Sequence, residues 1–150
     1  MKSNYMNSHV IILLIIMLFM LFSGDVSAQH NLGVHIDNIH SQQGKLYLGL
    51  FDTDVHFPHA GKERTALTME LDGIQNTAYI VFSNLPPGKY ALAVYQDING
   101  DNKCNTNAIG YPKEPFGFSN NIRPVLSAPS FSKTAVHLDM DTQIRIKLIK

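Results

Sequence analysis

The chain has little cysteine and no excess of charge of either sign. Its single cysteine, Cys104, cannot form an internal disulfide, so the fold must rest on its hydrophobic core. Lysine and arginine together number 12, as do aspartate and glutamate, and the formal net charge is zero. A neutral chain lacks both an acidic tail and the basic surface that nucleic-acid binding needs. We therefore expect no nucleic-acid partner.

The chain also lacks a hydrophobic run long enough to span a membrane. The longest run covers residues 10–22, which as a helix would reach roughly 20 Å, short of a hydrocarbon core of about 30 Å. Lys2 precedes this run and small residues follow it, an order typical of a secretory signal. We expect a cleaved signal peptide over 1–28 and one exported domain over 29–150, with no permanent membrane span after cleavage. The alternative is an uncleaved signal anchor.

Beyond this segment, apolar residues alternate with polar ones at a period of two, which is typical of strands. We expect about seven strands, over residues 31–40, 45–53, 66–71, 77–83, 89–96, 134–138 and 143–149. A turn signal at 41–44 predicts that the first two strands pair antiparallel, and a second hairpin is expected over 75–96. The pattern contains no convincing amphipathic helix. It predicts an all-β fold, an antiparallel two-sheet, immunoglobulin-like sandwich with one long ordered loop.

That loop covers residues 97–131 and holds four of the seven prolines. Long segments without regular structure inside a compact domain are usually functional or disordered. Aromatic residues such as Phe116 and Phe118 are interleaved with glycines here, which predicts an ordered loop packed against the sandwich. We do not expect it to contribute to a sheet. Any recognition surface is expected within 97–121.

The start of the loop resembles the first nine positions of a calcium-binding loop. The candidate ligands are Asp97, Asn99, Asp101, Lys103 (by its backbone carbonyl) and Asn105. The twelfth position is Ala108 where a bidentate glutamate would be needed, so Glu114 or Asn107 would have to complete a weak Ca²⁺ site. No other cofactor is expected. The alternative is a metal-free loop in which Asp and Asn side chains accept backbone hydrogen bonds in Asx turns.

Six histidines lie beyond the signal, and imidazole suits both metal binding and acid–base catalysis. Their spacing does not favour a metal site, because no third ligand can be named beside His56 and His59. The chain has no nucleophile motif such as Gly-x-Ser-x-Gly, so we assign no catalytic residue and consider an enzyme the weaker hypothesis. An alternative is a hydrolase or lyase that uses His56, His59 and Glu114, which requires these side chains to converge.

The favoured hypothesis is an exported, non-enzymatic β-sandwich module with a recognition or weak calcium-binding loop at 97–121. The lone Cys104 is expected to be half-buried as a small hydrophobic group. Its alternative use, an intermolecular disulfide, would fit a self-associating envelope protein. The partner and the oligomeric state stay open.

Three segments resemble the DUF2141 family of exported bacterial proteins. They read Leu-Pro-Pro-Gly-Lys-Tyr-Ala at 85–91, Tyr-Gln-Asp-Ile-Asn-Gly-Asp-Asn-Lys at 95–103, and Gly-Tyr-Pro-Lys-Glu-Pro-Phe-Gly-Phe-Ser-Asn-Asn at 110–121. The resemblance extends over roughly residues 32–149. It implies a periplasmic or secreted domain without an assigned activity. The chain departs from the family at 102–105, where Asn105 replaces an anionic oxygen ligand and Cys104 replaces a leucine, which weakens the calcium hypothesis.

The Pro-Pro-Gly-Lys-Tyr turn at 86–90 also resembles the turns of transthyretin-like and carboxypeptidase-regulatory sandwiches, which share a prealbumin-like fold. Such a likeness concerns the fold and not the function. The hydrolase branch of the transthyretin-like group ends in Tyr-Arg-Gly-Ser, whereas this chain ends in Lys-Leu-Ile-Lys at 147–150. That hydrolase activity is therefore not expected here.

Overall fold

The computed structural model describes residues 12, 28–40, 43–59, 61–71, 76–125 and 127–150. The expected signal peptide lies, apart from residues 12 and 28, outside the described residues. Half of the expected turn at 41–44 lies outside them as well. Within the described part, no helix has the length and the apolar character needed to cross a membrane.

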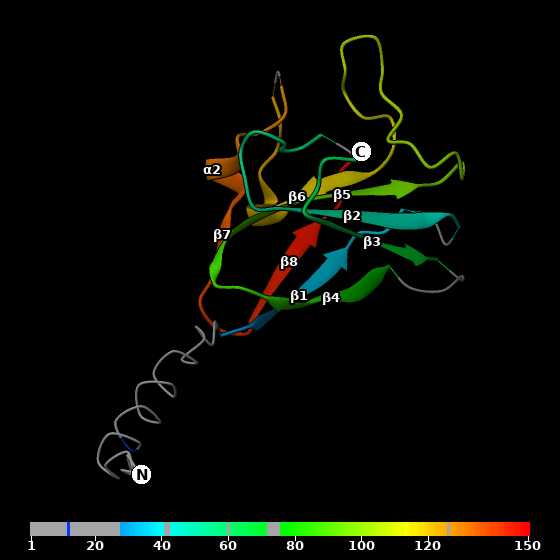
Figure 1. Cartoon of the computed structure of the whole chain (residues 1–150). Helices are drawn as coiled ribbons and strands as arrows, with labels where there is room; N and C mark the ends of the chain where they lie inside the picture. The colour runs from blue at the N-terminus through cyan, green and yellow to red at the C-terminus, as the bar shows by residue number, and fades with distance from the viewer. Residues whose placement is uncertain (1–11, 13–27, 41–42, 60, 72–75, 126) are drawn as a thin grey trace, which may run out of the picture.

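Within the described residues, eight strands form two sheets (Figure 1). The elements are β1 (His30–Asp37), β2 (Lys45–Phe51), β3 (Thr65–Glu70), β4 (Thr77–Leu85), β5 (Gly88–Asp97), β6 (Phe116–Phe118), the 3₁₀ turn η1 (Ser119–Asn121), the short helix α2 (Phe131–Thr134), β7 (Val136–Leu138) and β8 (Thr142–Lys147). One sheet has the order β4-β1-β8. The other has the order β3-β2-β5-β6, with β7 also paired to β5. The predicted all-β sandwich is confirmed.

The strand pairing differs from the two predicted hairpins. β1 pairs with β4 and β8, whereas β2 pairs with β3 and β5, so the predicted pairing of 31–40 with 45–53 is wrong. The predicted hairpin over 75–96 is wrong for the same reason, because β4 and β5 lie in different sheets. Strands that face each other across a core bury the same alternate residues as strands that lie side by side. Alternation alone therefore could not separate the two arrangements.

The β1–β8 pair is parallel, from Leu32 opposite Thr142 to Asp37 opposite Lys147. The other pairs between named strands are antiparallel. Parallel strands cannot be joined by a tight turn, since the chain must cross over before it returns. Here almost the whole domain lies between the two strands, and β1 becomes the centre of its sheet.

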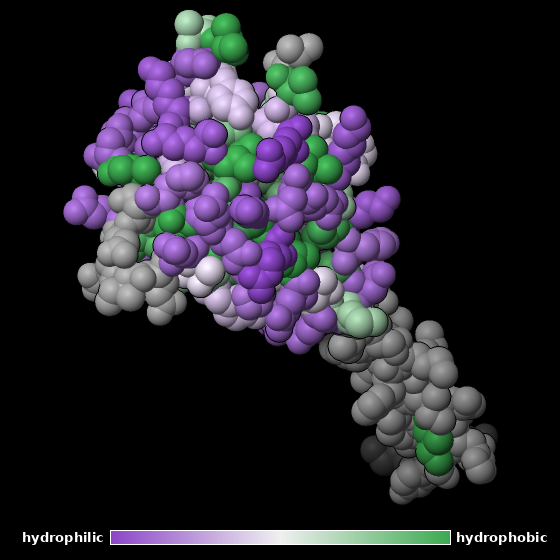
Figure 2. Space-filling model, turned by 180° about the vertical axis from the view of Figure 1, so that it is seen from behind, coloured by the Kyte–Doolittle hydropathy of each residue, from purple (hydrophilic) through white to green (hydrophobic). Residues whose placement is uncertain are grey.

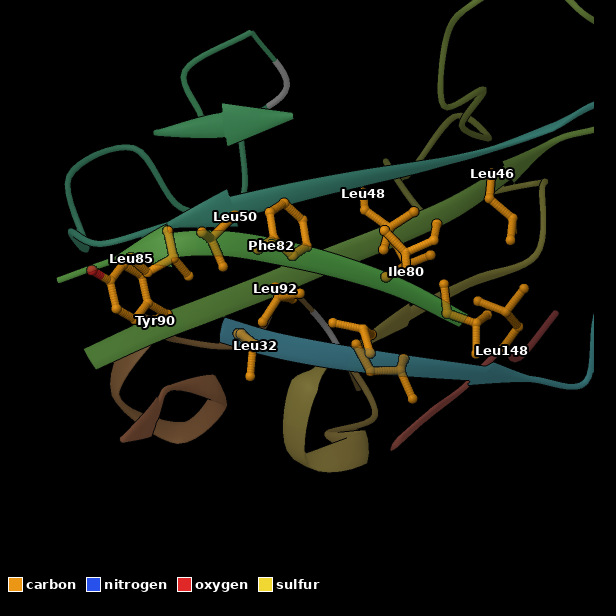
Figure 3. Close-up of a cluster of buried hydrophobic side chains, with 14 of the residues drawn as sticks. Leu32, Leu46, Leu48, Leu50, Ile80, Phe82, Leu85, Tyr90, Leu92 and Leu148 are labelled. Carbon is orange, nitrogen blue, oxygen red and sulfur yellow. The ribbon is translucent and has the colours of Figure 1, made fainter. Parts of the chain in front are cut away.

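The main core fills the space between the inner faces of the two sheets (Figure 3). Its buried residues include Leu32, Val34 and Ile36 of β1, Leu46, Leu48 and Leu50 of β2, Ile80 and Phe82 of β4, Leu92 and Val94 of β5, and Ile146 of β8. Burial of each such side chain stabilises the fold by about 1.5–3 kcal/mol. This core compensates for the absence of a disulfide.

A second, smaller cluster covers the outer face of the β2-β5-β6 sheet. It contains Phe51, Phe57, Ala91, Tyr95, Phe116 and Phe118. Because β5 contributes to both clusters, the strand is buried on both faces. The predicted long loop is ordered, but the expectation that it adds nothing to a sheet is wrong: β6 lies within it and pairs with residues 93–95 of β5.

Candidate functional site

A groove of about 520 Å³ opens on the outer face of the β2-β5-β6 sheet. Alternate residues of the strands form its floor, namely Tyr47, Gly49 and Phe51 of β2, Ala93 and Tyr95 of β5, and Phe116 and Phe118 of β6. Gly49 lies directly opposite Ala93 in the sheet register. The small, partly exposed Ala93, with aromatic rings around it, leaves a hollow in an otherwise aromatic surface, whereas the Glu63 side chain packs against Gly49.

Two loops form the walls of the groove. The β5–β6 loop, residues 98–115, contributes Cys104, Ile109, Gly110, Tyr111 and Pro112, and the η1–α2 loop, residues 122–130, contributes Pro124, Val125, Ser127 and Ala128. Both loops project from the same side of the domain (Figure 1). Ile109 is 85% exposed and Val125 is 87% exposed. Hydrophobic groups stand near the ends of two projections at the top of Figure 2.

Glu63 is the one charged side chain that lines the described groove. Its Oε1 atom accepts hydrogen bonds from the Tyr47 hydroxyl at 3.0 Å and from the Gly61 N–H at 2.9 Å. Burial, and then the hydrogen bond and charge of Glu63, raise the pKa of Tyr47 to about 12. The rings of Tyr47 and Tyr95 lie 5.1 Å apart between centroids. A carboxylate is thus held at the edge of an aromatic floor.

The predicted calcium-loop residues lie together at one end of β5, where side chains of the loop accept hydrogen bonds from other groups of the same loop. Asp97 is fully buried, and its carboxylate accepts the N–H groups of Gly100 at 2.7 Å and Asn102 at 2.8 Å. Asp101 accepts the Lys103 N–H and the side-chain amides of Asn99 and Asn105. This is the network of Asx turns that the metal-free alternative describes. The calcium site stays a prediction.

Glu114 holds the same loop through hydrogen bonds to two of its backbone groups. It is 7% exposed, and its two oxygens accept the N–H groups of Ile98 and Asn105, each at 3.2 Å. Burial raises the pKa of Glu114 although these hydrogen bonds lower it. The structure thus gives Glu114 a role in holding the loop.

The histidines of the enzyme alternative do not line the groove. His56 and His59 are exposed in the β2–β3 connection, and neither they nor Glu114 belong to its lining residues. Among the described residues there is also no group of three His, Cys, Asp or Glu side chains placed to hold a metal. The residues of the enzyme alternative and the groove therefore lie at separate places in the fold.

Cys104 packs against the outer aromatic cluster and lines the groove. Burial and the charge of Glu114 raise the pKa of its thiol to about 11. The thiolate is the reactive form, and a raised pKa keeps it scarce at neutral pH. In this structure Cys104 is a small hydrophobic group, as the sequence predicts.

The Gly-Phe-Ser-Asn-Asn segment at 117–121 forms hydrogen bonds to three parts of the fold, namely β5, the end of α2 and β8. The buried Ser119 hydroxyl accepts the Leu92 N–H at 2.9 Å and donates to the Thr134 carbonyl at 2.7 Å. The Asn120 amide lies within 3.1 Å of three backbone carbonyls at 133–135. Asn121 donates to the Arg145 carbonyl and accepts the Lys147 N–H of β8. The motif therefore has a structural role, and it anchors the base of the η1–α2 loop.

Sequence reasoning placed recognition in the 97–121 loop, and five groove-lining groups from the β2–β3 region were missed. These are Tyr47, Gly49, Phe51, Pro58 and Glu63. One signal was available: the alternate positions of β2 that a solvent-facing strand would fill with polar residues hold Tyr, Gly and Phe instead.

The chain matches a known protein family. The model of the family DUF2141, described as an uncharacterized protein conserved in bacteria, matches residues 34–146. No curated protein matches the chain, and no solved structure does. The family match spans nearly all of the sandwich, from β1 into β8. The predicted membership is therefore confirmed, and the chain belongs to the DUF2141 family.

Proposed function

We propose that this protein is an exported, non-enzymatic binding module whose groove holds a small, largely apolar molecule. The groove on the outer face of the β2-β5-β6 sheet carries the proposal. Its volume of about 520 Å³ falls within the range of small-molecule sites, which is roughly 300–1,000 Å³. Export is supported by the signal-like order of charge, hydrophobic run and small residues at the N-terminus.

The chemistry of the floor supports an apolar ligand. The partly exposed rings of Tyr47 and Tyr111 line the groove together with the more buried Tyr95, and transfer of apolar surface out of water is worth about 25 cal/mol per Å². Aromatic contacts add a preference for planar groups that can stack or pack edge to face. The exposed Ile109 and Val125 give such a ligand further apolar contact at the rim. The concave shape of the groove favours a small molecule as its ligand.

A neutral fluorescent probe, N-phenyl-1-naphthylamine, tests the proposal. We expect saturable binding of one probe molecule per chain, and loss of at least tenfold in affinity in Ala93→Leu, because the larger side chain fills the hollow opposite Gly49. Val81→Leu is the matched control, since Val81 is exposed on the other sheet and the change should leave probe affinity unaltered. Circular dichroism checks that both variants fold.

Absence of saturable binding, or equal affinity in Ala93→Leu, would overturn the proposed function. The self-association alternative makes a different prediction, which light scattering under oxidising and reducing conditions tests. A dimer that forms only under oxidising conditions and is absent in Cys104→Ser would favour that alternative.

A further inference from the structure

We infer that the groove selects ligands that carry a cationic nitrogen beside an apolar body, and that Glu63 selects them. This inference rests on the proposed binding function and adds the chemical class of the ligand. Among the described residues that line the groove there is one carboxylate and neither lysine, arginine nor histidine.

Although Lys62 and Arg64 flank Glu63 in the sequence, its carboxylate makes no salt bridge in the described part of the chain. Other carboxylates of the domain do: Asp52 lies 2.6 Å from the Arg64 guanidinium, and Asp37 lies 2.7 Å from that of Arg145. For Glu63, the described contacts are the neutral hydroxyl of Tyr47 and the neutral N–H of Gly61, both at Oε1. Its charge is therefore oriented but not compensated by a cation.

The Tyr47–Glu63 pair at the polar end of the groove accepts hydrogen bonds and has no proton of its own to donate to a ligand. The Tyr47 hydroxyl uses its proton on Glu63 Oε1, so the phenol oxygen has only lone pairs to offer. Within the described structure, Glu63 Oε2 accepts no hydrogen bond. A ligand group that donates several hydrogen bonds, such as an ammonium, matches this end. An anion or a pure acceptor does not.

The aromatic floor favours the same charge. The faces of aromatic rings carry negative electrostatic potential, and a cation within about 6 Å of a ring centroid is attracted to it. Tyr47 and Tyr95 lie side by side at 5.1 Å, next to the carboxylate. A nitrogen placed against Glu63 would thus meet a carboxylate and ring faces together.

A neutral apolar ligand would meet an opposing cost. It would displace water from Glu63 without replacing the lost hydrogen bonds, and desolvation of an unpaired charge is unfavourable. A cationic group replaces the water with a charge-assisted hydrogen bond, which is about twice as strong as a neutral one. The preference for a cation therefore comes from both attraction and avoided desolvation.

Three probes with the same apolar body test the inference: 1-naphthylmethylamine, which is cationic at pH 7, 1-naphthalenemethanol, which is neutral, and 1-naphthoic acid, which is anionic. We expect the amine to bind at least tenfold more tightly than the alcohol, and the acid most weakly. In Glu63→Gln the ratio of amine to alcohol affinity should fall to about one. Glu70→Gln, on the exposed end of β3, removes the same charge outside the groove and should keep the ratio.

The outcomes separate the two claims. If the amine and the alcohol bind equally, or if their ratio survives in Glu63→Gln, the inference is overturned while binding of N-phenyl-1-naphthylamine still supports the groove. If neither that neutral probe nor any naphthalene probe binds, the proposed function and the inference both fail. Glutamine keeps an oxygen that can accept from Tyr47, and the circular dichroism melt of Glu63→Gln checks that the fold is retained.

Discussion

Gly49 lies so close to Glu63 that a Cβ atom at position 49 would come within 2.7 Å of Glu63 Cγ. The same atom would stand 3.0 Å from the ring of Phe51. Glycine is needed here for space, and this close approach lets the Glu63 side chain rest against the strand beside Tyr47. The absence of a side chain at Gly49 on β2 thus determines where the Glu63 carboxylate lies in the groove.

Substitution Gly49→Ala should move the Glu63 carboxylate without changing its charge. We expect the Tyr47–Glu63 hydrogen bond to break and the amine-to-alcohol affinity ratio to fall at least threefold, because the charge no longer lies beside the aromatic floor. Titration of the probes measures this ratio. Gly88→Ala is the control, since its added Cβ would meet Tyr90 at an ordinary 3.5 Å. An unchanged ratio in Gly49→Ala would show that the position of Glu63 does not matter.

The pKa of Tyr47 provides a second readout of the same contact. It is raised to about 12, first by burial and then by Glu63, so Glu63→Gln should lower it but leave it above the ordinary value of 10. Because the folded-state pKa is raised, the stability that this group contributes is present below pH 10 and is lost as pH rises through 12. Absorbance near 295 nm follows the phenolate, and Tyr47→Phe identifies its step. Circular dichroism in parallel shows where unfolding begins.

Loss of the Ser119 hydroxyl should destabilise the domain. In Ser119→Ala the buried Leu92 N–H loses the hydroxyl oxygen that accepts it, while the Thr134 carbonyl keeps only its hydrogen bond from the Asn120 amide. An unsatisfied buried polar group costs about 1–3 kcal/mol, so we expect a loss of that order in the free energy of unfolding in urea. Ser132→Ala, at an exposed position of α2, should change it by less than about 0.5 kcal/mol. Equal losses of unfolding free energy in the two variants would contradict the role of the 117–121 segment in holding these elements together.

The calcium prediction at Asp97, Asn99 and Asp101 is tested by melting in calcium and in chelator. A site with a dissociation constant near 0.1 mM would add about 1–2 kcal/mol at millimolar calcium. The calcium hypothesis therefore expects a higher Tm for the parent protein and no such rise for Asp101→Ala. Identical melting curves would leave the Asx-turn network as the full account of this loop.

Asp97 should matter whether or not calcium binds. Its buried carboxylate accepts two N–H groups, from Gly100 and Asn102, and hydrogen bonds to a charged group are worth about 1.5–3 kcal/mol each. We expect Asp97→Ala to lower the free energy of unfolding by at least 2 kcal/mol in chelator, where urea unfolding measures it. A loss confined to calcium-containing buffer would instead assign Asp97 to an ion.

The class of fold and the position of most strands could be predicted because alternation is a local property of the sequence. Leu46, Leu48 and Leu50 alternate whatever β2 pairs with. Pairing is not local: β2 lies beside β5 and not beside β1, and no short-range pattern records which sheet a strand joins. The turn near Gly44 therefore suggested a hairpin that the structure does not contain.

The groove was harder to predict than the loop that forms one of its walls. The 97–121 loop has an unusual composition, which draws attention to it. Glu63 has an ordinary neighbourhood in the sequence, and its importance arises only where the β2–β3 connection brings it against Gly49 and Tyr47. Sites built from side chains of separate segments depend on tertiary geometry, and a single sequence does not reveal them.

The position of β1 between β4 and β8 has a consequence for how the chain can fold. The first strand of the domain pairs with the last, so its sheet cannot be completed until the C-terminal residues have emerged and arrived. Such non-local pairing slows folding. Until then one edge of β1 exposes unpaired N–H and C=O groups, which invite association with other chains. Pairing of β8 with β1 therefore ends the stage of folding in which this edge is exposed. A chain truncated before Thr142 should aggregate rather than fold.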